Sequence, residues 1–120
     1  MTRWRLTSPV VKLTENDVEL ACLQVLSIKR YWYAKLHAGT FKTADGLRWL
    51  KGVPKGTPDY TVHHGRHRGF LLEVKRPGGR LSPDQEVQIA MIRRQFGLPI
   101  AVVKSVEELA AWLAEHERSP

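Results

Sequence analysis

The chain has one cysteine, no long apolar run and few acidic residues in its central stretch, and each of these absences narrows the class of protein. Cys22 has no second cysteine to pair with, so we interpret it as a small core residue and expect no disulfide scaffold. No apolar stretch approaches the length that crosses a bilayer, so we expect no membrane association. Residues 1–7 hold two arginines but no apolar segment, which predicts no secretory signal and a reducing, cytoplasmic setting. A chain of 120 residues has room for one modest core, so we expect a single domain over residues 1–120, with its core at about 14–115.

Acidic residues are scarce where basic residues are dense. The formal net charge is +7, which favours a polyanionic partner. From Lys51 to Arg80 there are seven Lys and Arg residues and three histidines, but only two acids, Asp59 and Glu73. The rest of the chain is nearly balanced, with twelve basic and ten acidic residues. Two isolated carboxylates in a basic stretch favour a chemical role over a solubilising one. The simpler alternative is a basic surface that only binds nucleic acid.

Apolar periodicity and helix-capping residues predict the first half of the fold. Residues 14–30 have helical spacing, with Thr14 as the N-cap. Residues 31–37 are rich in aromatic side chains and predict a strand, whereas 39–55 predict a loop with a short strand or turn, facing DNA. The runs 59–63 and 70–75 are separated by a short glycine-bounded turn, so they predict an antiparallel hairpin.

The second half carries clearer helix signals. Ser82, Pro83 and Gln85 form an N-cap, a first-turn proline and a capping box, and this helix should end at Gly97. Residues 100–103 predict a buried strand, and 105–108 predict a second capping box before a last helix that extends to about 115. The order is helix, three strands, helix, strand, helix. It predicts an α/β fold with a mixed sheet flanked by helices.

The segment Glu73-Val74-Lys75 is the centre of the expected site. Side chains alternate along a strand, so Glu73 and Lys75 share one face, which we expect to be the more polar one. Folding the hairpin brings Asp59 beside Glu73. Two carboxylates with the Val74 carbonyl suit Mg²⁺, and a lysine beside the metal can act on the attacking water or on phosphate charge. Glu-x-Lys alone more often marks a same-face ion pair on a strand, so it is the combination with Pro58-Asp59 that favours catalysis.

Three segments carry a resemblance to a known family: GTPD at 56–59, EVKR at 73–76 and LSPDQ at 81–85. They resemble the motifs of the PD-(D/E)XK nuclease superfamily and, more closely, the VRR-NUC (virus-type replication-repair nuclease) domain. The resemblance spans most of the chain, so this looks like a stand-alone minimal domain. It implies a restriction-endonuclease-like αβββαβ core plus a C-terminal helix. It also implies Asp59 and Glu73 as ligands of Mg²⁺ or Mn²⁺, Lys75 as the catalytic lysine, and Gln85 near the site.

Such nucleases usually place a further glutamate on the first helix, and the sequence offers Glu15 and Glu19, one turn apart. Glu15 opens the helix as the family's glutamate does. Glu19 lies next to the apolar stripe, where a carboxylate needs a partner. Glu15 is favoured and Glu19 stays open.

Basic side chains near these motifs are the expected phosphate contacts, which bind DNA without reading its sequence. They are Lys51, Lys55, Arg66, Arg68, Arg76 and Arg80. The histidines at 63, 64 and 67 lack zinc-finger spacing, so they do not predict a zinc site. Gly78-Gly79 lacks a phosphate-loop pattern, so no nucleotide cofactor is expected.

The sequence therefore predicts a metal-dependent DNA endonuclease. The family resemblance implies a structure-selective enzyme that acts on Holliday-junction, flap or other branched DNA in phage-type replication, recombination or repair. One domain has one catalytic centre, so symmetric incision of a four-way junction calls for a homodimer. Two alternatives remain: a catalytically inactive DNA-binding module, and an interaction subunit of a larger complex.

Overall fold

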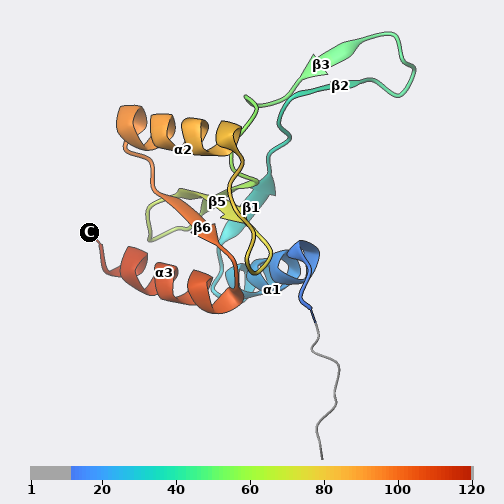
Figure 1. Ribbon diagram of the computed structural model, residues 1–120. Coiled ribbons are helices and arrows are strands. Elements are labelled where there is room, and N and C mark those ends of the chain that lie inside the picture. Colours follow the sequence, from blue (N-terminus) through green and yellow to red (C-terminus); the bar gives the residue numbers. More distant parts are fainter. Residues whose placement is uncertain (1–11, 120) are drawn as a thin grey trace, which may run out of the picture.

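The computed structural model describes residues 12–119, so the expectation about a secretory signal in residues 1–7 lies outside the described residues. The described chain begins with a helix, continues with five strands, and ends with a helix, a strand and a helix (Figure 1). In order they are α1 (Glu15–Ile28), β1 (Trp32–Lys35), β2 (Thr40–Lys42), β3 (Trp49–Lys51), β4 (Tyr60–His63), β5 (Phe70–Val74), α2 (Pro83–Phe96), β6 (Ile100–Val103) and α3 (Val106–Arg118). Within residues 12–119, none of these helices is long and apolar enough to cross a membrane.

The main sheet has four strands in the order β1-β4-β5-β6. β4 pairs antiparallel with both β1 and β5, and β6 runs parallel to β5. A parallel neighbour needs a crossover connection, and α2 supplies it. The predicted mixed sheet flanked by helices, with a further C-terminal helix, is confirmed.

Helix capping follows the sequence at two of the three helices. Thr14 and Ser82 each accept a hydrogen bond from the backbone of the third helical residue, and both capping boxes are complete. At α3 the Ser105 hydroxyl accepts from the Glu108 N–H, but the Glu108 carboxylate accepts from the N–H of Lys104 instead of Ser105. The predicted second capping box is therefore wrong by one residue, although both N–H groups are satisfied.

Helices cover both faces of the main sheet (Figure 1). Helices α1 and α3 lie on one face, where Cys22, Leu26 and Leu109 pack against Phe70 and Leu72. Cys22 is fully buried, which confirms its interpretation as a core residue, and burial raises the pKa of its thiol to about 11. Helix α2 lies on the other face.

The face of β5 that carries Glu73 is not polar, contrary to the prediction. Ile89 and Ile92 of α2 pack there against Leu71 and Ile100, and every residue of β5 is buried. Glu73 is only 1% exposed. The strand pattern alone does not show that the crossover helix returns over this face and encloses the carboxylate.

The stretch between β1 and β4 departs most from the prediction. Instead of a loop with a short strand or turn over 39–55, residues 40–51 form a second sheet in which β2 and β3 pair antiparallel. This hairpin projects from the body of the molecule (Figure 1). At its root the Gly39 N–H donates to Val53, and the Val53 N–H donates to His37.

Candidate active site

The segment that leads into β4 is fixed against the start of α2. Gly56 has a φ of +89°, and a Cβ added there would lie 2.4 Å from the carbonyl oxygen of Asp84. Only glycine allows both this backbone conformation and this close approach. The contact brings Asp59, three residues later, to the same end of the sheet as Gln85, so the two motifs meet through a backbone contact.

Three carboxylates converge at this end of the sheet. Glu15, Asp59 and Glu73 each offer an oxygen, and these oxygens all lie within 4.8 Å of one another. They come from the first turn of α1, the residue before β4 and the fourth residue of β5. In the β4–β5 ladder Tyr60 pairs with Leu72, which sets Asp59 beside Glu73. The predicted proximity of Asp59 and Glu73 is thus observed.

Two carboxylates of the acid cluster, Asp59 and Glu73, have raised pKa values. Burial and the neighbouring charge of Asp59 raise the pKa of Glu73 to about 7, although Lys75 opposes the shift. Burial also raises the pKa of Asp59, with Glu15 adding to the rise, while the Val74 N–H donates to Asp59 Oδ2 at 3.4 Å and opposes it. Desolvated carboxylates that face one another favour a proton or a cation between them.

One oxygen of Glu73 is left without a partner. Glu73 Oε1 is buried and has no hydrogen-bond donor among residues 12–119. A buried, unpaired carboxylate oxygen carries a large desolvation cost. Because it belongs to the carboxylate at the centre of an all-oxygen donor set, the arrangement fits a hard divalent cation such as Mg²⁺ or Mn²⁺.

Gln85 joins helix capping to the acid cluster. Its Oε1 accepts from the Ser82 N–H at 2.8 Å, which completes the capping box, and its Nε2 donates to Glu73 Oε2 at 3.0 Å. From the sequence, Gln85 could both complete the capping box and lie near the site, and both contacts are present. The amide therefore holds Oε2 of Glu73 and leaves Oε1 free of this hydrogen bond.

Lys75 places a cation beside the cluster. Its Nζ lies 3.4 Å from Glu73 Oε2, and its side chain is 15% exposed. Because it is two residues after Glu73, it shares the same strand face, as the alternation predicted. The ammonium is thus part of the site yet keeps access to solvent.

The structure separates the two helix-1 candidates. Glu15 belongs to the acid cluster, whereas Glu19 is turned to the Tyr60 hydroxyl, which donates to it, and to Lys35, 3.4 Å away. Glu19 therefore has the partners that its place beside the apolar stripe required. Geometry favours Glu15 as the ligand.

The basic residues expected to contact phosphate fall into separate groups. Arg76 and Arg80 follow β5 at the acid end, and Lys55 pairs with Asp84 at 3.2 Å. Arg66 and Arg68 lie in the β4–β5 turn, at the opposite end of the sheet, where Arg68 donates to the Gly97 carbonyl.

Lys51 stands apart from these groups, because it lies on the projecting hairpin. The histidines of the β4–β5 turn are also remote from the acid cluster. His64 and His67 pack on Tyr31, and His63 contacts Trp32.

Two residues beside the acid cluster, Lys35 and Tyr60, were not predicted from the sequence. Lys35 ends β1 opposite Tyr60, and its charge partly opposes the rise that burial causes in the pKa of Asp59. The Tyr60 hydroxyl holds Glu19. The position of Tyr60 directly after Asp59 was an available signal, but Lys35 reaches the site only through strand pairing, which the sequence did not specify.

The chain matches the model of a known protein family over most of its length. The model of the VRR-NUC domain matches residues 12–107, a range that contains all three acids, Lys75 and Gln85. The chain belongs to the VRR-NUC family. A VRR-NUC domain implies a nuclease-type function and binding to DNA, and the acid cluster agrees with the metal dependence typical of such domains. No curated protein and no solved structure matches this VRR-NUC chain.

Proposed function

We propose that this VRR-NUC chain is a DNA endonuclease that hydrolyses phosphodiester bonds with a divalent cation, Mg²⁺ or Mn²⁺. The observation that carries the proposal is the unpaired Oε1 of buried Glu73 within an oxygen cluster that also contains Asp59 and Glu15. These three carboxylates, with the Val74 carbonyl, are the groups that would hold the cation. When bound there, a divalent cation would polarise the phosphate and lower the pKa of its own bound water, so that hydroxide can form near neutral pH.

The side chains around the cation have distinct roles in this proposal. Lys75 sets its ammonium beside the carboxylates, where it stabilises negative charge on the scissile phosphate and orients the attacking water. Gln85 fixes the rotamer of Glu73 through the amide hydrogen bond, so it is a positioning residue. Arg76 and Arg80, exposed just after β5, contact the DNA backbone.

The proposal extends to the kind of DNA and to assembly. We infer that residues 12–119 act as one domain with one active centre and that the substrate is branched DNA, such as a flap or a Holliday junction, in phage-type replication or repair. Two copies would then be needed for symmetric incision of a four-way junction. Electrostatic binding by the basic surface predicts affinity that falls steeply with salt.

The test is cleavage of labelled linear, flap and four-way-junction DNA by wild type and Asp59→Asn, with Mg²⁺, with Mn²⁺ or with EDTA. We expect metal-dependent cleavage that Asp59→Asn reduces by about 100-fold or more, while binding in EDTA persists. Asn keeps the side-chain shape and an oxygen that accepts the Val74 N–H, so loss of cleavage reports on the charge. Binding without cleavage of any substrate by wild type would instead identify an inactive DNA-binding module.

A further inference from the structure

The projecting β2–β3 hairpin, residues 40–51, is rich in exposed apolar side chains. Phe41, Leu47, Trp49 and Leu50 are all exposed, and Trp49 keeps 66% of its surface open to solvent. The hairpin forms a sheet of its own, separate from the four main strands. A two-stranded ribbon with so little packing is marginally stable in water, so its apolar side chains are available to a partner.

Strand register divides this hairpin into two different faces. Phe41 pairs with Leu50 on one face, and Lys42 pairs with Trp49 on the other. The Lys42 Nζ lies 5.1 Å from the centre of the Trp49 ring. One face therefore combines an aromatic surface with a nearby cation, which are the two features that bind an unpaired nucleotide: a base stacks on the ring and phosphate meets the ammonium.

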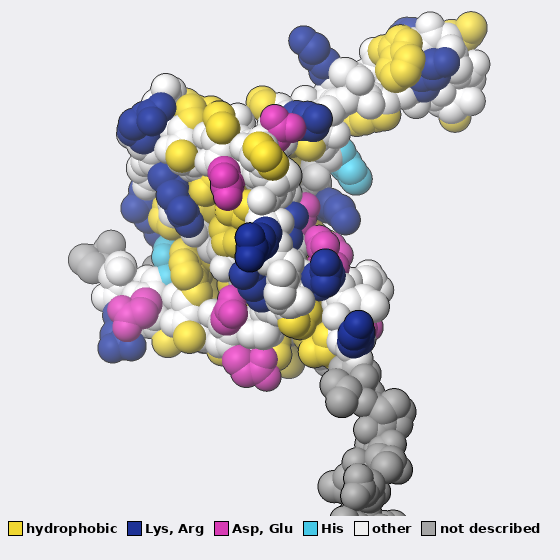
Figure 2. Space-filling model, viewed as in Figure 1, with side chains coloured by type: hydrophobic (Ala, Val, Ile, Leu, Met, Phe, Trp, Pro, Cys, Tyr) yellow, Lys and Arg dark blue, Asp and Glu magenta, His cyan; other side chains and the backbone are white. Residues whose placement is uncertain are grey.

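The charge of the hairpin is almost entirely of one sign. Lys42, Arg48 and Lys51 stand against a single acid, Asp45. Asp45 is occupied within the turn, where it accepts hydrogen bonds from the Thr43 hydroxyl and from the Leu47 N–H. Figure 2 shows basic and apolar side chains intermingled over the hairpin. The arm thus presents net positive charge together with aromatic surface.

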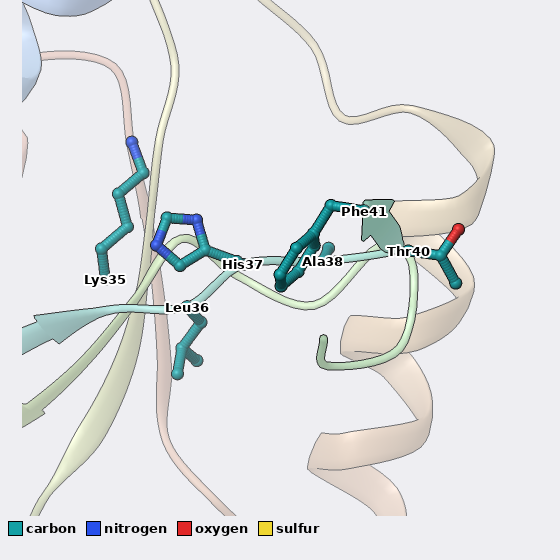
Figure 3. A pocket seen from close by; sticks show the side chains of 6 residues that line it. All are labelled: Lys35, Leu36, His37, Ala38, Thr40 and Phe41. Carbon is teal, nitrogen blue, oxygen red and sulfur yellow. The ribbon is translucent and has the colours of Figure 1, made fainter. Parts of the chain in front are cut away.

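A pocket of about 580 Å³ lies at the root of the hairpin (Figure 3). Its lining runs along the chain from the end of β1 into β2: Lys35, Leu36, His37, Ala38, Thr40 and Phe41. The volume is within the range of pockets that hold small ligands, and the side chains of His37 and Phe41 offer two further rings.

This pocket borders the backbone segment that carries Asp59. The Leu36 N–H donates to the Asp59 carbonyl at 2.7 Å, and Lys35 lies 3.4 Å from Glu19. An unpaired strand in the pocket would therefore lie close to the segment that carries Asp59.

We propose that the hairpin and the pocket at its root bind an unpaired strand of DNA, with Trp49 stacking on a base and Lys42 and Lys35 contacting phosphate. The inference rests on the proposed nuclease function and deepens it. The substrate class becomes DNA in which single strand adjoins duplex, with the unpaired strand on the arm and the junction at the acid cluster.

Charge favours DNA over a second copy of the chain as the occupant of this surface. Two identical hairpins in a symmetric contact would bring Lys42, Arg48 and Lys51 near their own copies, and like charges across an interface are unfavourable. A polyanion removes this repulsion.

The experiment measures binding in EDTA, so that cleavage does not contribute. Fluorescence anisotropy compares a blunt duplex with the same duplex bearing a single-stranded extension, for wild type, Trp49→Ala and Phe96→Ala. Phe96 is the matched control, an aromatic residue with 68% exposure at the end of α2. Trp49→Ala is expected to weaken binding of the extended DNA by about fivefold or more and to leave the blunt duplex within about twofold, whereas Phe96→Ala changes neither.

A second variant tests the position of the arm without touching its binding residues. A Cβ at Gly52 would lie 1.8 Å from the His37 carbonyl oxygen, so Gly52→Ala must displace the hairpin root. We expect it to lose the preference for the extended DNA while circular dichroism shows an intact fold. Binding of the extended DNA that stays at the wild-type level in both Trp49→Ala and Gly52→Ala would overturn the proposal.

Sedimentation velocity on the same proteins separates the alternatives. A change from dimer to monomer in Trp49→Ala, with DNA affinity unchanged, would overturn the proposal and make the hairpin a contact between copies. Selective loss of extended-DNA binding in a protein that never cleaves would support the arm and reject the nuclease function. Cleavage by wild type, together with extended-DNA binding that neither Trp49→Ala nor Gly52→Ala weakens, would reject the arm and support the nuclease function.

Discussion

Glu73 and Glu117 lie at opposite ends of the main sheet, and their carboxylates have opposite surroundings. Lys29 donates to one oxygen of Glu117 at 2.9 Å, and the Tyr31 hydroxyl donates to the other at 2.7 Å. Burial alone would raise the pKa of Glu117, but these two hydrogen bonds outweigh it and the pKa lies below its usual value. Glu73 has an equivalent lysine, Lys75, yet one of its oxygens has no donor within residues 12–119 and its pKa is raised to about 7.

The difference distinguishes a carboxylate whose charge is compensated within the chain from one whose charge is not. At Glu117 the protein supplies a partner for each oxygen, so the charge is compensated within the chain. At Glu73 the protein collects two further carboxylates and leaves the compensation incomplete. Carboxylates with perturbed pKa values of this kind are frequent at functional centres.

The largest expected effect comes from removing the lysine beside each glutamate. Lys75→Met should reduce metal-dependent cleavage by about 100-fold or more, because it removes a cation from the place where negative charge develops. Lys29→Met, at the other end of the sheet, should leave the rate within about twofold. Single-turnover cleavage of a labelled flap measures both. Equal losses in the two variants would mean that the acid cluster is not the reacting centre.

The next effect is on stability without metal. A raised folded-state pKa gives stability that is full below the unfolded value near 4.5 and is lost as pH rises through about 7, so above that pH the carboxylate of Glu73 opposes folding. Glu73→Gln should therefore raise the unfolding free energy in EDTA at pH 8 by about 1–3 kcal/mol. Urea unfolding checks this.

The same variant should also fail to gain stability from Mg²⁺, whereas wild type gains it. This second readout separates the loss of a ligand from a general improvement in packing. A Glu73→Gln protein that is less stable than wild type in EDTA at pH 8 would contradict the claim that the charge of Glu73 opposes folding.

A smaller effect tests the two roles of Gln85. Gln85→Ala and Ser82→Ala each remove one arm of the same capping box and should each cost about 1 kcal/mol in thermal or urea unfolding. Only Gln85→Ala also frees Glu73 to rotate, so it alone should slow cleavage, by about tenfold. If Ser82→Ala slows cleavage as much, the amide acts merely through the helix.

The smallest effect is expected at Glu117. A lowered folded-state pKa gives stability that is present above the unfolded value near 4.5 and is lost as pH falls below it. Glu117→Gln should cost about 1 kcal/mol at pH 7, progressively less below pH 4.5, and nothing in cleavage rate. The opposite signs for Glu73→Gln and Glu117→Gln in EDTA are the direct check on the comparison.

Much of the site was predictable because its signals are local. The run Asp59-Tyr60 with Glu73-Val74-Lys75 fits one hairpin, and the alternation of strand side chains puts Lys75 on the face of Glu73. The helix caps at Thr14 and Ser82 are likewise set by neighbouring residues. Local geometry therefore predicted the acid pair and the order of the helices and main-sheet strands, although the family resemblance was needed to assign roles.

Other features depend on chain segments that are distant in sequence. Glu73 was expected on a polar face, but α2 returns over that face and buries it. Glu15 and Glu19 share a helix face and are separated only by what each one meets, the acid cluster for Glu15 and Tyr60 for Glu19. The β2–β3 hairpin had no alternation strong enough to predict two paired strands.

The sequence by itself determined the three helices, their N-cap residues, the strands of the main sheet and the alignment of Asp59 with Glu73, because helix capping and strand alternation act over a few residues. Only the tertiary structure decided that Glu73 is buried, that Glu15 completes the cluster and that Lys35 lies beside it. Burial and charge proximity arise between segments that meet in space, and those contacts set the desolvation that raises the pKa of Glu73.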